Sequence, residues 1–241
     1  VCVLPADRVE ELAPALRAAG CTMLVAEHDD AIRWSDLVAS GDPEWRGEVS
    51  SEPVILYTSG TSGFPKGTYA RWTPHRESTV QGYLDSVRST MATAAEGTHL
   101  VAGPLHHNGP LMGLRSLMCG RPVVVLPRFD AQAALAAIET YRIASSVMVP
   151  THLRRILALP TEVLESYDTS SLASLILTGA SCPPDLKRRA IEFFGPVISE
   201  AYGGSESGTV CQVTSAESLE RPGTVGRPLP RYEVLVIGEN G

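Results

Sequence analysis

Short β-rich apolar runs alternate with amphipathic helical segments along most of this chain, and that alternation limits the possible folds more than any other feature. Strands are predicted at 54–57, 123–126, 146–149, 174–178, 197–200 and 233–237. Parallel strands need long crossover connections, most often helices, and such sheets are covered on both faces. The sequence therefore predicts an α/β fold of mostly parallel sheets flanked by helices.

Residues that favour helix ends mark the predicted helices between these strands. Asp130 is predicted to cap one helix and Thr151 the next. Pro184 lies near the start of a third, which is expected to stop at Gly195. Two further helices are predicted at 6–20 and 74–91.

Three predicted loops follow strands and carry small or polar residues. They come after Tyr57, after Leu177 ("TGAS") and after Glu200 ("YGGSES"). Ligands of open α/β sheets bind beyond the carboxyl ends of the strands. We therefore expect these three loops on one edge of the sheet.

The charge of the chain argues against a nucleic-acid partner. Its formal net charge is −7 and its pI is about 5.4, whereas nucleic-acid surfaces cluster Lys and Arg. The densest basic group is Lys187, Arg188 and Arg189, which we expect to form a solvated helix face. The apolar runs are strand-sized, so the sequence predicts no transmembrane segment.

Cysteine and histidine usage argues against a zinc site. The five cysteines include no CxxC pair, which is typical of reduced thiols in a cytoplasmic protein. His106 and His107 are adjacent and cannot share the i, i+4 helix face of paired zinc ligands.

The organisation along the chain changes near residue 207, where the helical pattern fades. We predict an α/β core over 1–206 and the start of a small β-rich subdomain over 207–241. The chain begins at Val1 and stops in "VIGENG", so we expect a piece of a larger protein.

The segment "LYTSGTSGFPKG" (56–67) has the composition of a polyphosphate-binding loop. Its glycines let the backbone bend and approach a ligand closely. Thr58, Ser59, Thr61 and Ser62 add hydroxyl donors, and Lys66 adds a positive charge. The alternative for such a loop is an ordinary hydrophilic surface turn.

Two other motifs fail on this chain. The kinase-type P-loop requires glycine where Pro65 stands, and Ser or Thr where Gly67 stands. The nucleophile elbow of α/β-hydrolases, G-x-S-x-G, lacks its last glycine around Ser205 and also around Ser62.

The string "YTSGTSGFPKG" resembles the phosphate loop of the adenylate-forming (AMP-binding) superfamily, which includes acyl-CoA synthetases, peptide-synthetase adenylation domains and luciferases. "GPLHHNGPL", "LILTGASCPPDLKRR" and "ISEAYGGSESG" match further family segments in the family's order. "GTVGRPLPRYEVLVIGENG" is a weaker match, with Arg231 and Gly238 departing from the pattern. The resemblance covers most of the chain from Pro53 and implies part of the large N-terminal domain of an acyl-CoA synthetase.

This resemblance implies a ligase. The enzyme would activate a fatty, aryl or steroid-like carboxylic acid with ATP, release pyrophosphate and pass the acyl group from the adenylate to CoA. It implies ATP and Mg²⁺ as cofactors and CoA as co-substrate, and it is compatible with a homodimer.

The resemblance also assigns roles to individual residues. Lys66, His107 and Glu206 would be catalytic. Tyr202 would lie against the adenine, the alternative for this residue being a core tyrosine. Glu206 and Thr58 would hold Mg²⁺, and His106, His107 and Gly204 would contact the acid. The nucleotide would be held by Thr58, Ser59, Gly60, Thr61, Ser62, Gly63, Lys66, Gly179, Ala180, Ser181, Tyr202, Gly203 and Ser205.

Two other functions fit the same motifs. A peptide-synthetase-type domain would need an acidic anchor for its amino acid near His106 and His107, and no Asp is there. A non-catalytic ATP- or AMP-binding module is the other, although Lys66, Tyr202 and Glu206 are intact. The family's ribose-binding aspartate and C-terminal lysine do not occur before Gly241, so we expect little ligase activity from the isolated chain.

Overall fold

The computed structural model describes residues 2–3, 9–18, 24–25, 29, 32–41, 55–58, 66–69, 80–91, 95–104, 107, 109–110 and 112–238. The chain divides into two compact units, Val1–Gly47 and Glu48–Gly241, and each is described by itself. No helix among these residues is long and apolar enough to cross a membrane.

The first unit contains a small parallel pair of strands. β1 (Cys2–Val3) pairs with β2 (Leu24–Val25), and α1 (Val9–Ala18) lies between them in sequence. The unit also contains α2 (Trp34–Ala39). α1 confirms the centre of the helix predicted at 6–20, and its residues Val9 and Ala13 are buried one turn apart.

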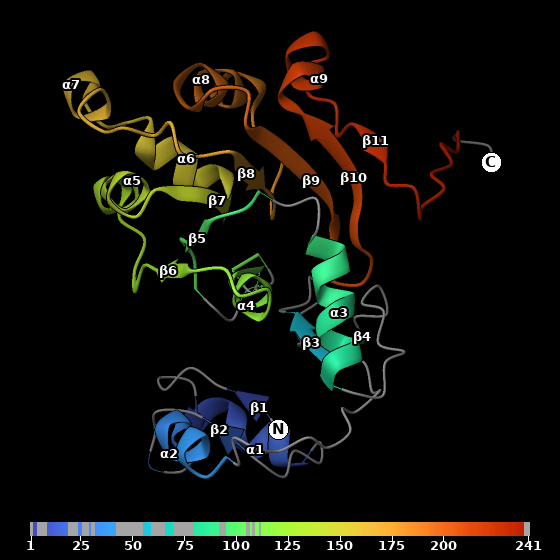
Figure 1. Ribbon diagram of the computed structural model, residues 1–241. Coiled ribbons are helices and arrows are strands. Elements are labelled where there is room, and N and C mark those ends of the chain that lie inside the picture. The colour runs from blue at the N-terminus through green and yellow to red at the C-terminus, as the bar shows by residue number, and fades with distance from the viewer. Residues whose placement is uncertain are drawn as a thin grey trace. The chain divides into compact units, whose positions relative to one another are not determined.

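The second unit is built on a seven-stranded sheet in the order β11-β10-β9-β8-β7-β5-β6. Pairing is parallel from β9 to β6 and antiparallel between β9, β10 and β11. The prediction of a mostly parallel α/β sheet is confirmed (Figure 1). The strands are β5 (Thr98–Val101), β6 (Val123–Val125), β7 (Ile143–Met148), β8 (Ser174–Leu177), β9 (Ile198–Gly204), β10 (Gly208–Thr214) and β11 (Arg227–Pro228).

Helices pack on both faces of this sheet. α5, α6 and α8 lie on one face and α4 lies on the other (Figure 1). A cluster of buried residues that includes Leu100, Leu135, Ile138, Leu175 and Phe194 joins the first of these faces to its helices. The helices are α3 (Val80–Met91), α4 (Met112–Met118), α5 (Ala131–Thr140), α6 (Pro150–Ile156), α7 (Thr161–Leu164), α8 (Pro184–Phe194) and α9 (Ser215–Glu220).

Three of the predicted helix ends are confirmed by their hydrogen bonds and geometry. The Asp130 carboxylate accepts from the Ala133 N–H at 2.8 Å and caps α5. α8 starts at Pro184 and stops at its C-cap residue Gly195, which has a φ of +84°. Thr151 is not a cap, because α6 begins at Pro150 and its N-cap is Val149. Pro150 takes the first helical position, where its missing N–H costs nothing. α3 confirms residues 80–91 of the helix predicted at 74–91, and residues 74–79 lie outside the described residues.

The first predicted strand does not belong to the large sheet. β3 (Ile55–Thr58) pairs antiparallel with β4 (Lys66–Tyr69) in a separate two-stranded sheet. The loop after Tyr57 is therefore the connection of a hairpin. The expectation that it shares an edge of one sheet with the other two loops was wrong, because among the described strands β3 pairs with β4 and with no strand of the large sheet.

The strand predicted at 233–237 is also absent. These residues form no strand, and Leu235, Val236 and Ile237 are 74%, 96% and 72% exposed. A strand needs a neighbour for its backbone N–H and C=O groups, and no described strand pairs with this segment. The hairpin of β9 and β10 joins residues on both sides of the boundary predicted near 207, and that boundary stays a prediction.

His99 is a buried polar side chain between the sheet and α4. It is 5% exposed, and its Nδ1 lies 2.9 Å from the Ser145 Oγ. Its Nε2 has no hydrogen-bond partner among the described residues. Burial lowers the pKa of His99 to about 4, since the charged imidazolium would lack both water and a counterion.

The lowered pKa of His99 predicts that the protein loses stability in mild acid. Between pH 6.5 and 4 the unfolded chain binds a proton at His99 that the folded chain does not, so stability falls as pH is lowered. From pH 7 to 5 the effect is about 2 kcal/mol. His99→Gln should remove most of this decline in urea unfolding at the two pH values. His152, whose pKa is also lowered, contributes a remainder in the same direction. An unchanged decline in His99→Gln would contradict the assignment.

Candidate functional site

The carboxyl ends of four adjacent strands form one edge of the sheet. β5, β7, β8 and β9 are parallel neighbours, so the residues that follow them lie along the same edge. This edge receives His107 after β5, the turn Gly179–Ser181 after β8 and Tyr202 near the end of β9. Sequence-predicted acid and nucleotide residues are thereby brought together by strand pairing.

Close packing shows that the segments after β5 and β8 meet. A Cβ on Gly109 would lie 3.1 Å from Val147 Cγ1 and 3.6 Å from Thr178 Cγ2. The Thr178 N–H donates to the Met148 carbonyl at 3.1 Å. His107 is exposed, and its N–H donates to the Pro104 carbonyl at 3.1 Å. The predicted acid segment therefore lies directly beside the predicted adenine turn. His106, also predicted to contact the acid, lies outside the described residues.

The turn after β8 has a backbone shape that glycine favours. Gly179 has a φ of +83°, and a Cβ there would lie 3.3 Å from Val149 Cγ1. Gly179, Ala180 and Ser181 are all exposed. The turn therefore presents backbone and small side chains, as a surface that approaches a flat ligand closely requires.

Tyr202 is carried by β9 on the same face as two buried residues. Side chains alternate along a strand, so Ile198, Glu200 and Tyr202 point to one side. Ile198 and Glu200 are buried, whereas Tyr202 is 56% exposed. Tyr202 is therefore not a core tyrosine, and its ring is available to a ligand at the edge.

The hairpin turn after Tyr202 is closely packed. The Gly204 N–H donates to the Ser207 Oγ at 3.2 Å, and that hydroxyl donates to the Gly208 carbonyl at 3.1 Å. The Tyr232 hydroxyl donates to the Ser207 carbonyl. Ser205 and Glu206 lie within this turn, and Glu206 is exposed.

Glu206 fits the implied magnesium ion in one respect. Mg²⁺ in nucleotide sites is held by one or two carboxylates together with phosphate oxygens. No group of three or more His, Cys, Asp or Glu that could hold a metal occurs among the described residues. A single exposed carboxylate suits an ion that arrives with a nucleotide.

The predicted phosphate loop connects the strands of the β3–β4 hairpin. Thr58 and Lys66 face each other as the last pair of this ladder. The connecting residues 59–65 lie outside the described residues, so Ser59, Gly60, Thr61, Ser62 and Gly63 remain predictions.

The expectation that Lys187 lies on a solvated helix face was wrong. It is 4% exposed and forms an ion pair with Glu200, which is 6% exposed. Only Arg188 and Arg189 of the basic group are exposed. A solvated face was expected because the three residues are consecutive, but one position in such a run of a helix can turn toward the sheet. The alternation of side chains along β9, which turns Glu200 inward, was the available signal that a buried cation should pair with it.

His152 is a second residue that sequence reasoning missed. It follows β7 at the same edge and stacks on Phe129, with ring centroids 4.0 Å apart. A Cβ on Gly103 would lie 3.7 Å from His152 Cε1. Burial and the Arg155 charge lower its pKa, and its Nδ1 has no partner in the described part of the chain. Its position after a strand was the signal that could have identified it.

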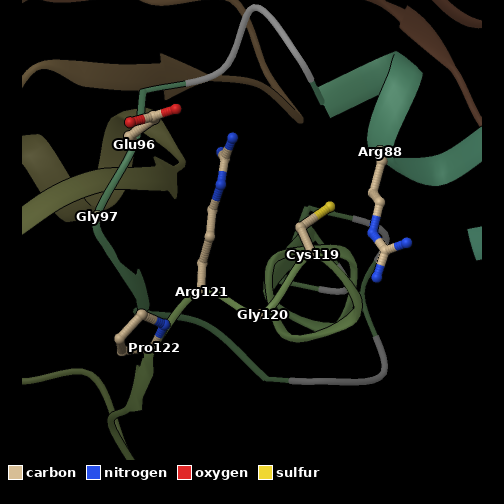
Figure 2. A pocket seen from close by; sticks show the side chains of 7 residues that line it. All are labelled: Arg88, Glu96, Gly97, Cys119, Gly120, Arg121 and Pro122. Atoms are coloured by element: carbon tan, nitrogen blue, oxygen red, sulfur yellow. The ribbon is translucent and has the colours of Figure 1, made fainter. Parts of the chain in front are cut away.

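A cleft of about 420 Å³ opens at the other edge of the sheet, beside the amino ends of β5 and β6 (Figure 2). Arg121 lines it but also donates to the carbonyls of Met91 and Ala95 at 3.2 and 3.0 Å. Its guanidinium therefore donates hydrogen bonds to carbonyl groups at and just after the C-terminal end of α3. None of the predicted site residues that the structure describes lines this cleft.

Comparisons with known proteins show the family to which this chain is similar. The family model described as "AMP-binding enzyme" matches residues 1–241. Over 195 residues the chain is 33% identical to the indoleacetate–CoA ligase of Aromatoleum aromaticum, covering 78% of this chain and 36% of that protein. It is 31% identical to the 2-succinylbenzoate–CoA ligase of Bacillus pumilus over 191 residues, covering 78% and 37%.

A solved structure extends the similarity to nearly the whole chain. The amide bond synthetase McbA from Marinactinospora thermotolerans superposes with a TM-score of 0.74 at 25% identity, covering 99% of this chain and 47% of that one. The chain thus spans between a third and a half of the length of these relatives.

The backbone of the β9–β10 hairpin predicts a glycine requirement. A Cβ on Gly203 would lie 1.9 Å from the Gly208 carbonyl oxygen, whereas one on Gly204 would meet the end of the Glu206 side chain at 3.1 Å. Gly203→Ala should lower the free energy of unfolding by about 1–3 kcal/mol, and Gly204→Ala by less, because a side chain can move aside. Thermal unfolding of both variants tests this. Equal losses would contradict the described hairpin.

Proposed function

The chain belongs to the AMP-binding enzyme family, and we propose that it uses ATP to convert a carboxylic acid into an acyl adenylate and then transfers the acyl group to the thiol of CoA. The observation that supports this most is the meeting of three predicted ligand segments at the carboxyl edge: His107, the turn Gly179–Ser181 and the exposed ring of Tyr202. The names of the two matched relatives, both CoA ligases, favour CoA as the acceptor.

In the first proposed step a carboxylate oxygen of the acid attacks the α-phosphorus of ATP, and the bond to pyrophosphate breaks. Most of the protein's contribution is to hold the reactants and to stabilise charge. Lys66 is in the last pair of the β3–β4 ladder, and its ammonium group is proposed to bind the β- and γ-phosphates. Tyr202 supplies a flat surface for the adenine, opposite the turn that carries Gly179.

The acid is proposed to lie beside His107, because that segment packs against the adenine turn and so reaches the α-phosphate. In the second step the CoA sulfur attacks the acyl carbon, and AMP leaves with the bonding electrons. Glu206 would hold Mg²⁺ with its carboxylate. When bound, the ion would neutralise charge on the phosphates.

An amine is the second candidate acceptor. It is favoured by the amide bond synthetase that superposes on 99% of the chain. The adenylation step is the same for both acceptors, and only the nucleophile of the second step differs.

The test is adenylation by the full-length protein with fatty, aryl and steroid acids, including indoleacetate and 2-succinylbenzoate. Acyl-AMP and pyrophosphate are measured alone, with CoA and with a panel of amines. We expect acyl-AMP with at least one acid and consumption of the adenylate by CoA. Consumption by amines alone would identify the second acceptor, and no acyl-AMP with any acid would refute the proposal.

Lys66→Ala should weaken ATP binding by about 10–100-fold, since hydrogen bonds to charged groups contribute roughly 1.5–3 kcal/mol. AMP binding should change much less, because AMP lacks the β- and γ-phosphates. Isothermal titration calorimetry with both nucleotides measures the difference. Equal losses for ATP and AMP would show that Lys66 does not act at the outer phosphates.

A further inference from the structure

The Glu200 carboxylate connects three pieces of the structure at the carboxyl edge. Its Oε1 accepts a hydrogen bond from the Cys182 N–H at 3.0 Å, and its Oε2 is ion-paired with Lys187 Nζ. Glu200 belongs to β9, Cys182 follows the turn after β8, and Lys187 lies in the first turns of α8. One buried side chain thus joins a strand, a turn and a helix.

The turn Gly179–Ser181 is attached to Glu200 at both of its ends. Before the turn, Leu177 is the parallel register partner of Glu200 in the sheet. After the turn, Cys182 donates its N–H to the Glu200 carboxylate. Both ends of the turn are therefore attached to a single residue of β9.

The same residue lies next to the aromatic ring on the other side. Glu200 and Tyr202 point to one face of β9, about 7 Å apart along the strand. A change in the reach of the Glu200 side chain would therefore alter the gap between the turn and Tyr202.

Stability alone gives little reason for a charged pair at this place. Removing two charges from water costs free energy, and an apolar pair of similar volume is often as stable. The Cys182 N–H is an additional requirement, because a buried donor needs an acceptor. A carboxylate supplies that acceptor, and Lys187 compensates its charge.

We propose that Glu200 is a positioning residue for the nucleotide, which fixes the turn Gly179–Ser181 at a set distance from Tyr202, and that Lys187 makes the buried carboxylate tolerable. This inference rests on the proposed function, because it assigns a ligand to the gap between the turn and the ring.

Cys182 offers a reporter of the turn that does not depend on nucleotide. Its side chain is 3% exposed, and burial together with the Glu200 charge raises the pKa of its thiol to about 11. Alkylation requires access and the thiolate. The intact structure therefore predicts slow alkylation of Cys182, and displacement of the turn predicts faster alkylation.

The experiment compares two double variants of the full-length protein that both remove the buried charges. Lys187→Met with Glu200→Gln keeps an acceptor oxygen for the Cys182 N–H, and Lys187→Met with Glu200→Met removes it. AMP affinity is measured by calorimetry, and Cys182 alkylation by iodoacetamide is followed by peptide mass spectrometry. Both are measured at a temperature where the variants are folded.

We expect K187M/E200Q to bind AMP within about threefold of the unsubstituted protein, and K187M/E200M to bind about tenfold more weakly, with faster alkylation of Cys182. Arg188→Met is the matched control. It breaks an exposed ion pair with Glu192 on the same helix, at 2.7 Å, and should change neither measurement. If K187M/E200M does not fold, Glu200→Asp keeps the charge but shortens the reach and should weaken AMP binding.

Two outcomes separate this inference from the proposed function. If K187M/E200M, or Glu200→Asp in its place, binds AMP as tightly as the unsubstituted protein, the positioning role is overturned and the proposed function stands. If the unsubstituted protein binds neither AMP nor ATP, the proposed function fails and the positioning role fails with it.

Discussion

Parallel hydrogen bonding among β5, β7, β8 and β9 is the constraint on which the candidate site depends. It places the carboxyl ends of four strands along one edge, so segments far apart in sequence become neighbours without any direct attraction between their side chains. The pairing requires two covered faces, which α4 on one side and α5, α6 and α8 on the other provide. The buried leucines and isoleucines of this core therefore determine where His107, Gly179 and Tyr202 lie.

The sequence was sufficient for the parts of the fold that follow local rules. Alternation of strands and helices gave the α/β class, Asp130 and Gly195 gave two helix ends, and motif order gave the family. These predictions succeeded because each depends on a few neighbouring residues whose preferences agree with the fold. For the site, the loops after β8 and β9 were placed on one edge from the strand pattern alone.

The failures involve partners that are distant in sequence. β3 pairs with β4, and residues 233–237 have no pairing strand among those described, yet both segments have a similar strand-like composition. Lys187 was expected in solvent because its neighbours Arg188 and Arg189 are charged. Its burial depends on Glu200, thirteen positions later in the chain. The alternation of β9 indicates that Glu200 faces inward, but nothing in the sequence of α8 itself identifies Glu200 as the partner of Lys187. Composition indicates whether a segment can form a strand or helix, whereas its contacts with residues distant in sequence determine where it lies in the fold.

At the end of β9 the backbone is held in place while the side chain of Tyr202 is exposed. β8 stops at Leu177, opposite Glu200, so the residues of β9 beyond that point have β10 as their described neighbour. A two-stranded ribbon is marginally stable by itself. Here it is restrained by Glu200 at one end and by the Tyr232 hydroxyl on the Ser207 carbonyl at the other. Tyr202 lies between these restraints, so its ring can be 56% exposed while its backbone is held on both sides. A ligand that stacks on such a ring would not have to order the strand that carries it, and more of its contact energy would remain as affinity.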